Sequence, residues 1–442
     1  MFQLNTENRW FSLLPLLLFV LTFLGAGIYS GDFYLLPSPI AAVIGIVSAY
    51  LLFKGNLAEK TDTFLKGCGD GKILTMCMIY LLAGAFASVS KASGSVDSIV
   101  NLGLTFIPIE FLPAGIFLLA SFLSFASGTS VGAIVTLGPI VIELAEQSGS
   151  PLGIVAAALL CGSMFGDNLS IISDTTIAAT QSIGAEMKDK FRANAALALP
   201  AAVLATAIFL WIGSGSDLGT IKVVGPREYN LILILPYLLV IILAVVGVHV
   251  FVTLFLGLLL AAVLGLFNGS FDLLTLGKTT YTGFTNMTEI FFLSLFTGGL
   301  AALVEKAGGI RYLLNLIEKR LRSKRTALLG IAGTVSLTNL CVANNTIAIL
   351  VSGKVAKEVT EKYHVEKKQA ASVLDIFACY VQGLIPYGAQ VLILISLSKF
   401  KIEYSQLFIH SYYLHLLIII TLLSIFFGRK YKENKPKTTI NT

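Results

Sequence analysis

Charged side chains are scarce in this 442-residue chain. Asp, Glu, Lys and Arg make up 13% of the residues, whereas 56% of the residues are hydrophobic. An average soluble domain has about a quarter of its residues charged, so this scarcity excludes an ordinary soluble protein. Hydrophobic runs of about 18 residues or more recur along the chain, and each can cross a bilayer as a helix. The composition therefore predicts an all-α polytopic membrane protein embedded in a lipid bilayer.

The five cysteines include no CxxC pair, which excludes the common paired-cysteine motifs for metal binding or redox chemistry. Most of them lie inside hydrophobic runs, where a cysteine packs as a small hydrophobic side chain. The net charge is +6, but Lys and Arg collect in short loops and in the tail at 429–442. This distribution is typical of topology signals in membrane proteins, and we expect no nucleic-acid partner.

The hydrophobic runs repeat with an offset of 215 residues, so that six elements of an N-terminal repeat (1–215) match six of a C-terminal repeat (216–428). The segments GAFASVSKASG (84–94) and GLAALVEKAGG (299–309) share six of eleven residues in this register. Internal duplication of this kind is typical of secondary transporters.

The basic loops indicate how the chain crosses the membrane. The segment 306–325, the loop 354–368 and the C-terminal tail are rich in Lys, so we place them in the cytoplasm. All three lie on one side only if the element 326–356 is a re-entrant hairpin. Its counterpart at 113–145 is then a hairpin from the opposite side, and the basic loop 54–72 is cytoplasmic. Each half thus has about five crossings and a hairpin, and the odd number inverts the second half.

Each half also contains a broken hydrophobic element after its hairpin. Polar residues interrupt the element 151–183, and Gly and Pro interrupt the element 368–398. Unpaired backbone groups in a bilayer cost several kcal/mol each, so a broken helix is tolerated where protein or a water-filled cavity satisfies it. We expect the breaks and the hairpin tips to meet at a midplane binding site, with the other helices as a scaffold.

The motif GDNLSIISDTT (166–176) places two carboxylates inside a very hydrophobic stretch. Asp167, Ser170 and Asp174 share one face if the segment is helical. A carboxylate near the bilayer centre costs a few kcal/mol, so function is its default explanation, although either Asp could instead cap a half-helix. Carboxylate and hydroxyl oxygens suit a hard cation such as Na⁺. We expect Na⁺ to bind at Asp167 and Asp174 and to compete there with protons.

Further polar residues extend this candidate site. They comprise Asn168, Ser173 and Thr175 in the motif, Gly128, Thr129 and Ser130 at the first hairpin tip, and Asn344, Asn345 and Thr346 at the second. In the C-terminal broken element, Asp375 is a candidate second titrating group or substrate contact. Gln390 follows the break in that element and is a candidate for contact with an organic substrate.

The segment FGDNLSIISDTT (165–176) resembles the signature of the NhaC-type sodium/proton antiporter family, in the wider ion-transporter superfamily. It departs from that signature at Asn168, where Lys or Met is usual, and at Ile171, where Pro is usual. The resemblance implies re-entrant hairpins paired with broken helices. It also implies a cation site at Asp167, Ser173, Asp174 and Thr175. The family includes exchangers of organic acids and carriers of amino acids.

We therefore expect a secondary active transporter, a Na⁺/H⁺ antiporter that works by alternating access, in the bacterial cytoplasmic membrane with both termini in the cytoplasm. The alternative is a Na⁺- or H⁺-coupled transporter of a small organic acid or amino acid. We expect no enzyme activity, because an intramembrane aspartyl protease would carry a Gly-x-Gly-Asp element that is absent here. We expect no cofactor besides Na⁺, and a homodimer formed through the scaffold helices.

Overall fold

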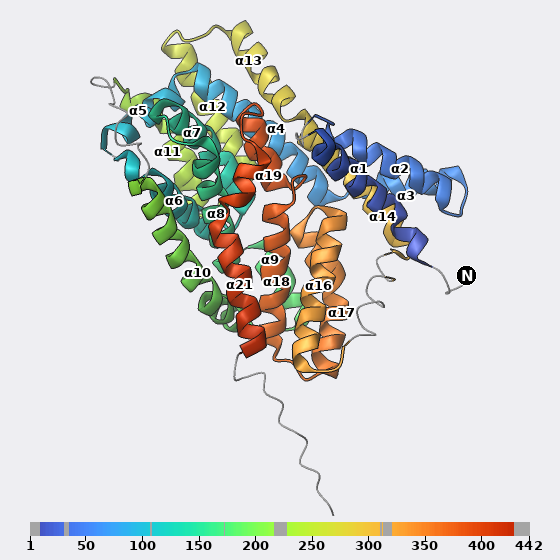
Figure 1. Ribbon diagram of the computed structural model, residues 1–442. Helices are drawn as coiled ribbons and strands as arrows, with labels where there is room; N and C mark the ends of the chain where they lie inside the picture. Colours follow the sequence, from blue (N-terminus) through green and yellow to red (C-terminus); the bar gives the residue numbers. More distant parts are fainter. Residues whose placement is uncertain are drawn as a thin grey trace, which may run out of the picture.

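The computed structural model describes residues 9–30, 35–106, 108–171, 173–215, 228–309, 312 and 321–427. Nine helices in these ranges are long and apolar enough to cross a membrane. The expected all-α membrane class is therefore confirmed (Figure 1). The basic tail at 429–442 and most of the basic segment 306–325 lie outside the described residues.

Four scaffold helices of the first half have counterparts in the same order in the second half. In the N-terminal repeat they are α1 (Leu14–Ser30), α2 (Ser38–Leu52), α3 (Leu57–Cys68), α4 (Gly71–Ala92) and α5 (Ser95–Phe106), preceded by η1 (Arg9–Leu13). In the C-terminal repeat they are α11 (Leu231–Val245), α12 (Val250–Phe267), α13 (Leu273–Asn286) and α14 (Thr288–Lys306). These four are the counterparts of α1 to α4, and the segment 215 residues beyond α5 lies mostly outside the described residues. Each repeat ends in further helices, namely α10 (Met187–Gly215) in the first and α20 (Tyr404–Ile409) and α21 (Tyr412–Phe427) in the second.

The scaffold helices of each half pack against scaffold helices of the other half. Helix α3 packs on α14, and its counterpart α13 packs on α4. The hydropathy pattern did not indicate α3, which lies in the basic segment expected as a loop. Asn56 caps it by accepting a hydrogen bond from the Glu59 backbone N–H at 2.7 Å, and none of its residues is buried. A short, charged helix of this kind has no long hydrophobic run to reveal it.

Each segment expected as a re-entrant hairpin forms two helices joined by a tight turn. Helices α6 (Leu112–Ser127) and α7 (Ser130–Ser148) form the first hairpin, after the short η2 (Ile109–Phe111). Helices α16 (Lys324–Val342) and α17 (Asn345–Lys362) form the second and lie side by side in Figure 1.

The two hairpin tips turn in the same way. Gly128 and Ala343, which are 215 residues apart, both have left-handed backbone with φ of 72° and 51°. The next residues, Thr129 and Asn344, are both extended, with φ of −150° and −147°. Each then caps the following helix by accepting a hydrogen bond from the backbone N–H three residues ahead. Residues 215 apart at the two tips therefore have similar backbone angles.

The broken elements also match residue for residue. Helix α8 (Leu152–Leu169) is followed by α9 (Asp174–Ile183), and α18 (Lys367–Leu384) is followed by α19 (Ala389–Leu397). Both helix ends and both restarts are 215 residues apart.

Helix α8 lies against the first hairpin with almost no space between the backbones. A Cβ atom added at Gly162 would lie 2.2 Å from the Phe117 carbonyl oxygen, and one at Gly166 would lie 2.4 Å from the Ser121 carbonyl oxygen. Small residues allow this approach, which sets the position of the hairpin tip relative to the end of α8.

We expect Gly162→Ala to destabilise the protein by about 1–3 kcal/mol, because the added methyl group must push the α6 backbone away. The measurement is fluorescence-detected thermal unfolding in detergent. Gly115→Ala is the matched control, since nothing lies within 4 Å of a Cβ atom there. Equal melting temperatures for the two variants would show that the close contact is unimportant.

Candidate functional site

Asp167 lies in the last turn of α8 and is only 4% exposed. Ser130, at the first hairpin tip, donates a hydrogen bond from its hydroxyl to Asp167 Oδ2 at 2.8 Å. Ser173, in the break between α8 and α9, donates to Asp167 Oδ1 and also contacts the hydroxyl of Thr175 at 2.9 Å. The structure thus brings four of the predicted site residues together around one buried carboxylate.

Asp174 is not part of this group. The helix stops at Leu169 and restarts at Asp174, so the spacing that would place both carboxylates on one continuous face does not apply. The Asp174 side chain is exposed and lies in the first turn of α9, where a negative charge is favoured by the helix dipole. Ser170 has another task, because its hydroxyl donates to the Phe125 carbonyl oxygen at 2.9 Å and ties the break to α6.

Two glutamines connect the Asp167 group to the C-terminal repeat. Gln390 donates to the Ser130 hydroxyl at 3.1 Å, and Gln382 donates to Gln390 Oε1 at 2.9 Å. Both side chains are buried. The predicted site residue Gln390 therefore contacts Asp167 indirectly, through the Ser130 hydroxyl.

A second buried cluster centres on an ion pair between Lys190 of α10 and Asp375 of α18. Lys190 Nζ lies 2.8 Å from Asp375 Oδ2, and the two side chains are 1% and 0% exposed. Lys190 also donates to the Thr176 hydroxyl at 2.6 Å, and Asn194 donates to Asp375 Oδ2 and to the Asn168 carbonyl oxygen, each at 2.8 Å. The side chain of Asn168 donates to the Tyr413 hydroxyl at 3.1 Å.

Four residues of these clusters were not predicted from the sequence, namely Lys190, Asn194, Thr176 and Gln382. Lys190 stands at the edge of the hydrophobic run 191–213, where a lysine usually reaches the membrane surface. A usable signal was present, since Lys190 and Asn194 are four residues apart and share one face of a helix.

The second hairpin tip lies on the Asp375 side. The Asn345 amide is 3.8 Å from Cys379 Sγ, which is itself 3.8 Å from Asp375 Oδ1. The Asn345 side chain also accepts from the Thr346 backbone N–H at 3.0 Å, and Asn344 donates to Met76 Sδ at 3.1 Å. The predicted residues therefore divide into two neighbouring groups, each of which contains one hairpin tip and one carboxylate.

The two groups together carry one net negative charge when Asp167, Asp375 and Lys190 are all charged. Lys190 offsets Asp375 through a direct ion pair. The contacts of Asp167 come from two neutral hydroxyls. Carboxylate and hydroxyl oxygens are the ligands that a hard monovalent cation prefers, and the C-terminal end of α8 adds the negative end of its helix dipole. The Asp167 group therefore offers oxygen atoms of the kinds that such a cation prefers.

Comparison with known proteins agrees with this chemistry. The chain matches the model of the Na⁺/H⁺ antiporter family over residues 10–214 and 228–429. It belongs to this family. The resemblance to NhaC-type antiporters is thereby confirmed, as are the transporter class and the location in a membrane.

Several curated relatives match most of the chain. The chain is 26% identical to the malate-2H⁺/Na⁺-lactate antiporter of Bacillus subtilis, over 79% of both chains. It is also 26% identical to the Na⁺/H⁺ antiporter NhaC of Alkalihalophilus pseudofirmus, over 72% of this chain and 75% of the relative. The arginine/ornithine antiporter ArcD of Halobacterium salinarum is 22% identical over 73% of this chain and 72% of its own. Among solved structures, the YdaH transporter of Alcanivorax borkumensis matches with a TM-score of 0.44 at 13% identity, covering 83% of this chain and 86% of that one.

Proposed function

We propose that the chain exchanges Na⁺ for protons by alternating access, with Asp167 as the group that the two cations occupy in turn. The observation that carries this proposal is a buried carboxylate whose hydrogen-bond donors are neutral hydroxyls, beside an ion pair that is already balanced. An isolated charge in a low-dielectric interior is costly, so the carboxylate favours an occupant, either Na⁺ or a proton. One net negative charge accepts one monovalent cation, which points to one-for-one exchange.

The site is built from four separate segments of the chain. Ser130 comes from a hairpin tip, Asp167 from a helix end and Ser173 from a break, and Gln390 comes from the other repeat. A movement of α19 against the unit formed by the first hairpin and α8 would change the contacts of Ser130 and with them the affinity of the Asp167 group for Na⁺. Such gating at broken helices is the usual basis of alternating access in duplicated transporters.

The function is tested with the purified chain in proteoliposomes that contain a pH-sensitive dye. We expect an imposed Na⁺ gradient to move protons in the opposite direction without any organic solute. If proton movement requires an added carboxylate or amino acid, the alternative function holds, namely a Na⁺- or H⁺-coupled transporter of a small organic solute. That alternative is favoured by the relatives named for malate, lactate, arginine and ornithine.

Competition at one carboxylate makes a kinetic prediction. We expect the KM for Na⁺ to rise as the pH falls, by up to about tenfold per pH unit, because one proton excludes one Na⁺. The maximal rate at saturating Na⁺ should change much less. Initial rates measured over a matrix of pH values and Na⁺ concentrations check this, and a KM that is independent of pH contradicts a shared site.

We further propose that the chain lies in a bacterial cytoplasmic membrane with both termini in the cytoplasm and that its scaffold helices pair with a second copy. The exposed lysines support this orientation. They lie at Lys54 and Lys66, before and within α3, and at Lys354, Lys357, Lys362 and Lys367, along α17 and at the start of α18, as the positive-inside rule expects of cytoplasmic segments.

A further inference from the structure

An ion pair ties the first hairpin to the scaffold. Lys91 Nζ, in the last turn of α4, lies 2.8 Å from Glu143 Oε1 of α7 and 2.7 Å from Asp97 Oδ1 of α5. Helix α7 also packs on α4, α5 and α11. The second helix of the first hairpin is therefore held against the scaffold both by packing and by a charge contact.

Both residues of the contact between α4 and α7 recur in the second half. Lys306 and Glu358 stand 215 residues after Lys91 and Glu143. Each lysine lies in the last turn of its scaffold helix, and each glutamate lies in the second helix of its hairpin. Since only 13% of the residues are charged, chance seldom repeats both members of such a pair.

The repeated pair is not formed in this structure. Lys306 Nζ instead lies 2.8 Å from Glu59 Oε1 of α3, and Glu358 is exposed and pairs with no cation among the described residues. Helix α17, the counterpart of α7, packs mainly on α9, α16 and α18. Asp97 has no acidic counterpart, because residue 312 is Tyr, so the repetition is confined to the lysine and the glutamate.

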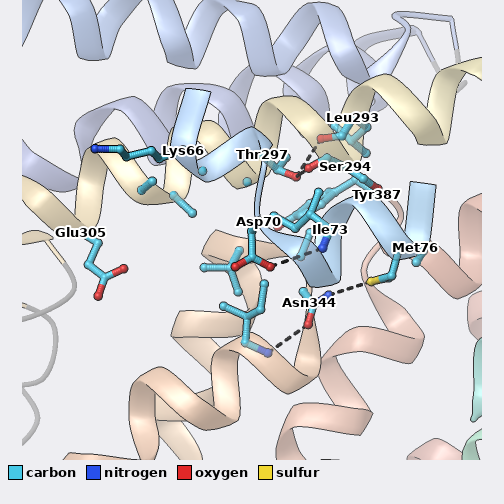
Figure 2. A pocket seen from close by; sticks show the side chains of 18 of the residues that line it. Lys66, Asp70, Ile73, Met76, Leu293, Ser294, Thr297, Glu305, Asn344 and Tyr387 are labelled. Atoms are coloured by element: carbon cyan, nitrogen blue, oxygen red, sulfur yellow. Dashed lines mark hydrogen bonds between the residues drawn. The ribbon is translucent and has the colours of Figure 1, made fainter. Parts of the chain in front are cut away.

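A cavity of about 420 Å³ separates the second hairpin tip from the scaffold helices α3, α4 and α14. Figure 2 shows Asn344, at the tip, and Met76 toward one end of this cavity and Lys66 toward the other. Lys306 lines the cavity as well. The side chains of Lys66 and Lys306 are 76% and 49% exposed, so the cavity opens to the protein surface there.

The inner end of the cavity adjoins the exchange site. Ala389 lines the cavity, and the next residue, Gln390, contacts Ser130 beside Asp167. With the orientation proposed above, the open end lies on the cytoplasmic side. The second hairpin is thus separated from the scaffold on the inner side, while the first hairpin is tied to it on the outer side.

We infer that two alternative ion pairs close the two sides of the transporter in turn. Lys91 and Glu143 close the outer side in this structure. When the inner side closes, Lys306 leaves Glu59 and pairs with Glu358, and the outer pair opens. In inverted repeats, each half takes in one state the conformation that the other half has in the opposite state. The inference rests on the alternating access proposed above and on the expected inversion of the second half.

The exposure of these ion pairs suits a reversible contact. Both formed pairs, Lys91 with Glu143 and Lys306 with Glu59, are partly exposed. An ion pair in contact with water stabilises its state only slightly, so either pair can break in each transport cycle. A small difference is enough to shift the populations of two states that have similar free energies.

The test is disulfide cross-linking of the full chain in membranes. The two partly exposed cysteines, Cys68 and Cys341, are first replaced by Ala, and the other three native cysteines are buried. Lys306→Cys and Glu358→Cys are then introduced together, copper phenanthroline is added as the oxidant, and the cross-linked peptide is measured by mass spectrometry. We expect the disulfide between positions 306 and 358 to accumulate with time, as the chain visits the state that is closed on the inner side.

The matched control combines Lys306→Cys with Glu361→Cys. Glu361 is also an exposed glutamate of α17, but its counterpart Glu146 pairs with Lys401 and not with Lys91. We expect at least about tenfold less cross-linking there, because a disulfide needs Cα atoms within about 7 Å of each other. Absence of the disulfide between positions 306 and 358, or equal cross-linking in the control, would overturn the inference.

A charge variant in the other half tests whether the two pairs alternate. Glu143→Gln keeps the shape of the side chain and removes the outer pair, so we expect the disulfide between positions 306 and 358 to form about two- to fivefold faster. Glu186→Gln, at an exposed glutamate outside both pairs, should leave this rate unchanged. An unchanged rate in Glu143→Gln would refute the alternation. Cross-linking needs no Na⁺ or proton flux, so its failure is distinguishable from a failure of the proposed ion exchange.

Discussion

Asp167→Asn is expected to lower the initial rate of Na⁺-driven proton movement in proteoliposomes at least about a hundredfold, which corresponds to about 2.7 kcal/mol of lost cation stabilisation. The amide has nearly the same size and can still accept a hydrogen bond from Ser130 or Ser173. It carries no charge to hold Na⁺ and no proton to release. The structural environment is thus preserved while the exchange chemistry is removed.

Asp174→Asn is the matched control, because it makes the same chemical change only seven residues away in the sequence. Its carboxylate is exposed and lies outside the hydrogen-bonded group around Asp167. We expect this variant to retain most of the exchange rate. Equal losses in both variants, or full activity in Asp167→Asn, would show that the buried carboxylate is not the cation site. Thermal unfolding of both variants verifies that neither loss comes from misfolding.

Lys190→Met is expected to destabilise the protein by about 3–5 kcal/mol, because it leaves the Asp375 carboxylate buried without its cation. Asn194 and Cys379 remain near that carboxylate, but neither carries a positive charge. The measurement is thermal unfolding in detergent, supported by the yield of folded protein after extraction from the membrane. The control is Lys66→Met, which breaks an ion pair whose side chains are 76% and 60% exposed and should cost less than about 1 kcal/mol.

The double variant Lys190→Met, Asp375→Leu tests whether the ion pair is the cause. Replacing a buried pair by apolar side chains of similar volume is often neutral, whereas removal of one partner is not. We expect the double variant to be clearly more stable than Lys190→Met alone. If the two substitutions destabilise additively, the stability of this region depends on packing, and the pair is not a charge-balancing unit.

Much of the fold could be predicted because a bilayer restricts the chain strongly. Hairpins, breaks and the 215-residue register follow from hydrophobic length and from the position of polar residues. Helix α3 could not be predicted in this way, because it is charged and only partly packed. Its place is set by contact with α14, which is distant in the sequence.

Only part of the site could be predicted from the sequence. Asp167 stands in the middle of a hydrophobic run, so its cost in the membrane marks it without a structure. The roles of Asp174 and Lys190 depend on where a helix breaks and on which way a side chain at its edge turns. The break between Leu169 and Asp174 decides the first of these questions. Packing between α10 and α18 decides the second. The spacing of Lys190 and Asn194 marks a shared helix face but does not show what that face contacts.

The shared offset of the two broken helices places Gln382 where the first repeat has Asp167. One half of the molecule thus keeps an acid at this position, and the other keeps an uncharged amide of similar reach. A symmetrical backbone therefore supports unsymmetrical chemistry: only one of the two equivalent positions can be neutralised by an ion. Conversion of Gln382 to an acid would create a second such position next to the first, linked to it through Gln390 and Ser130.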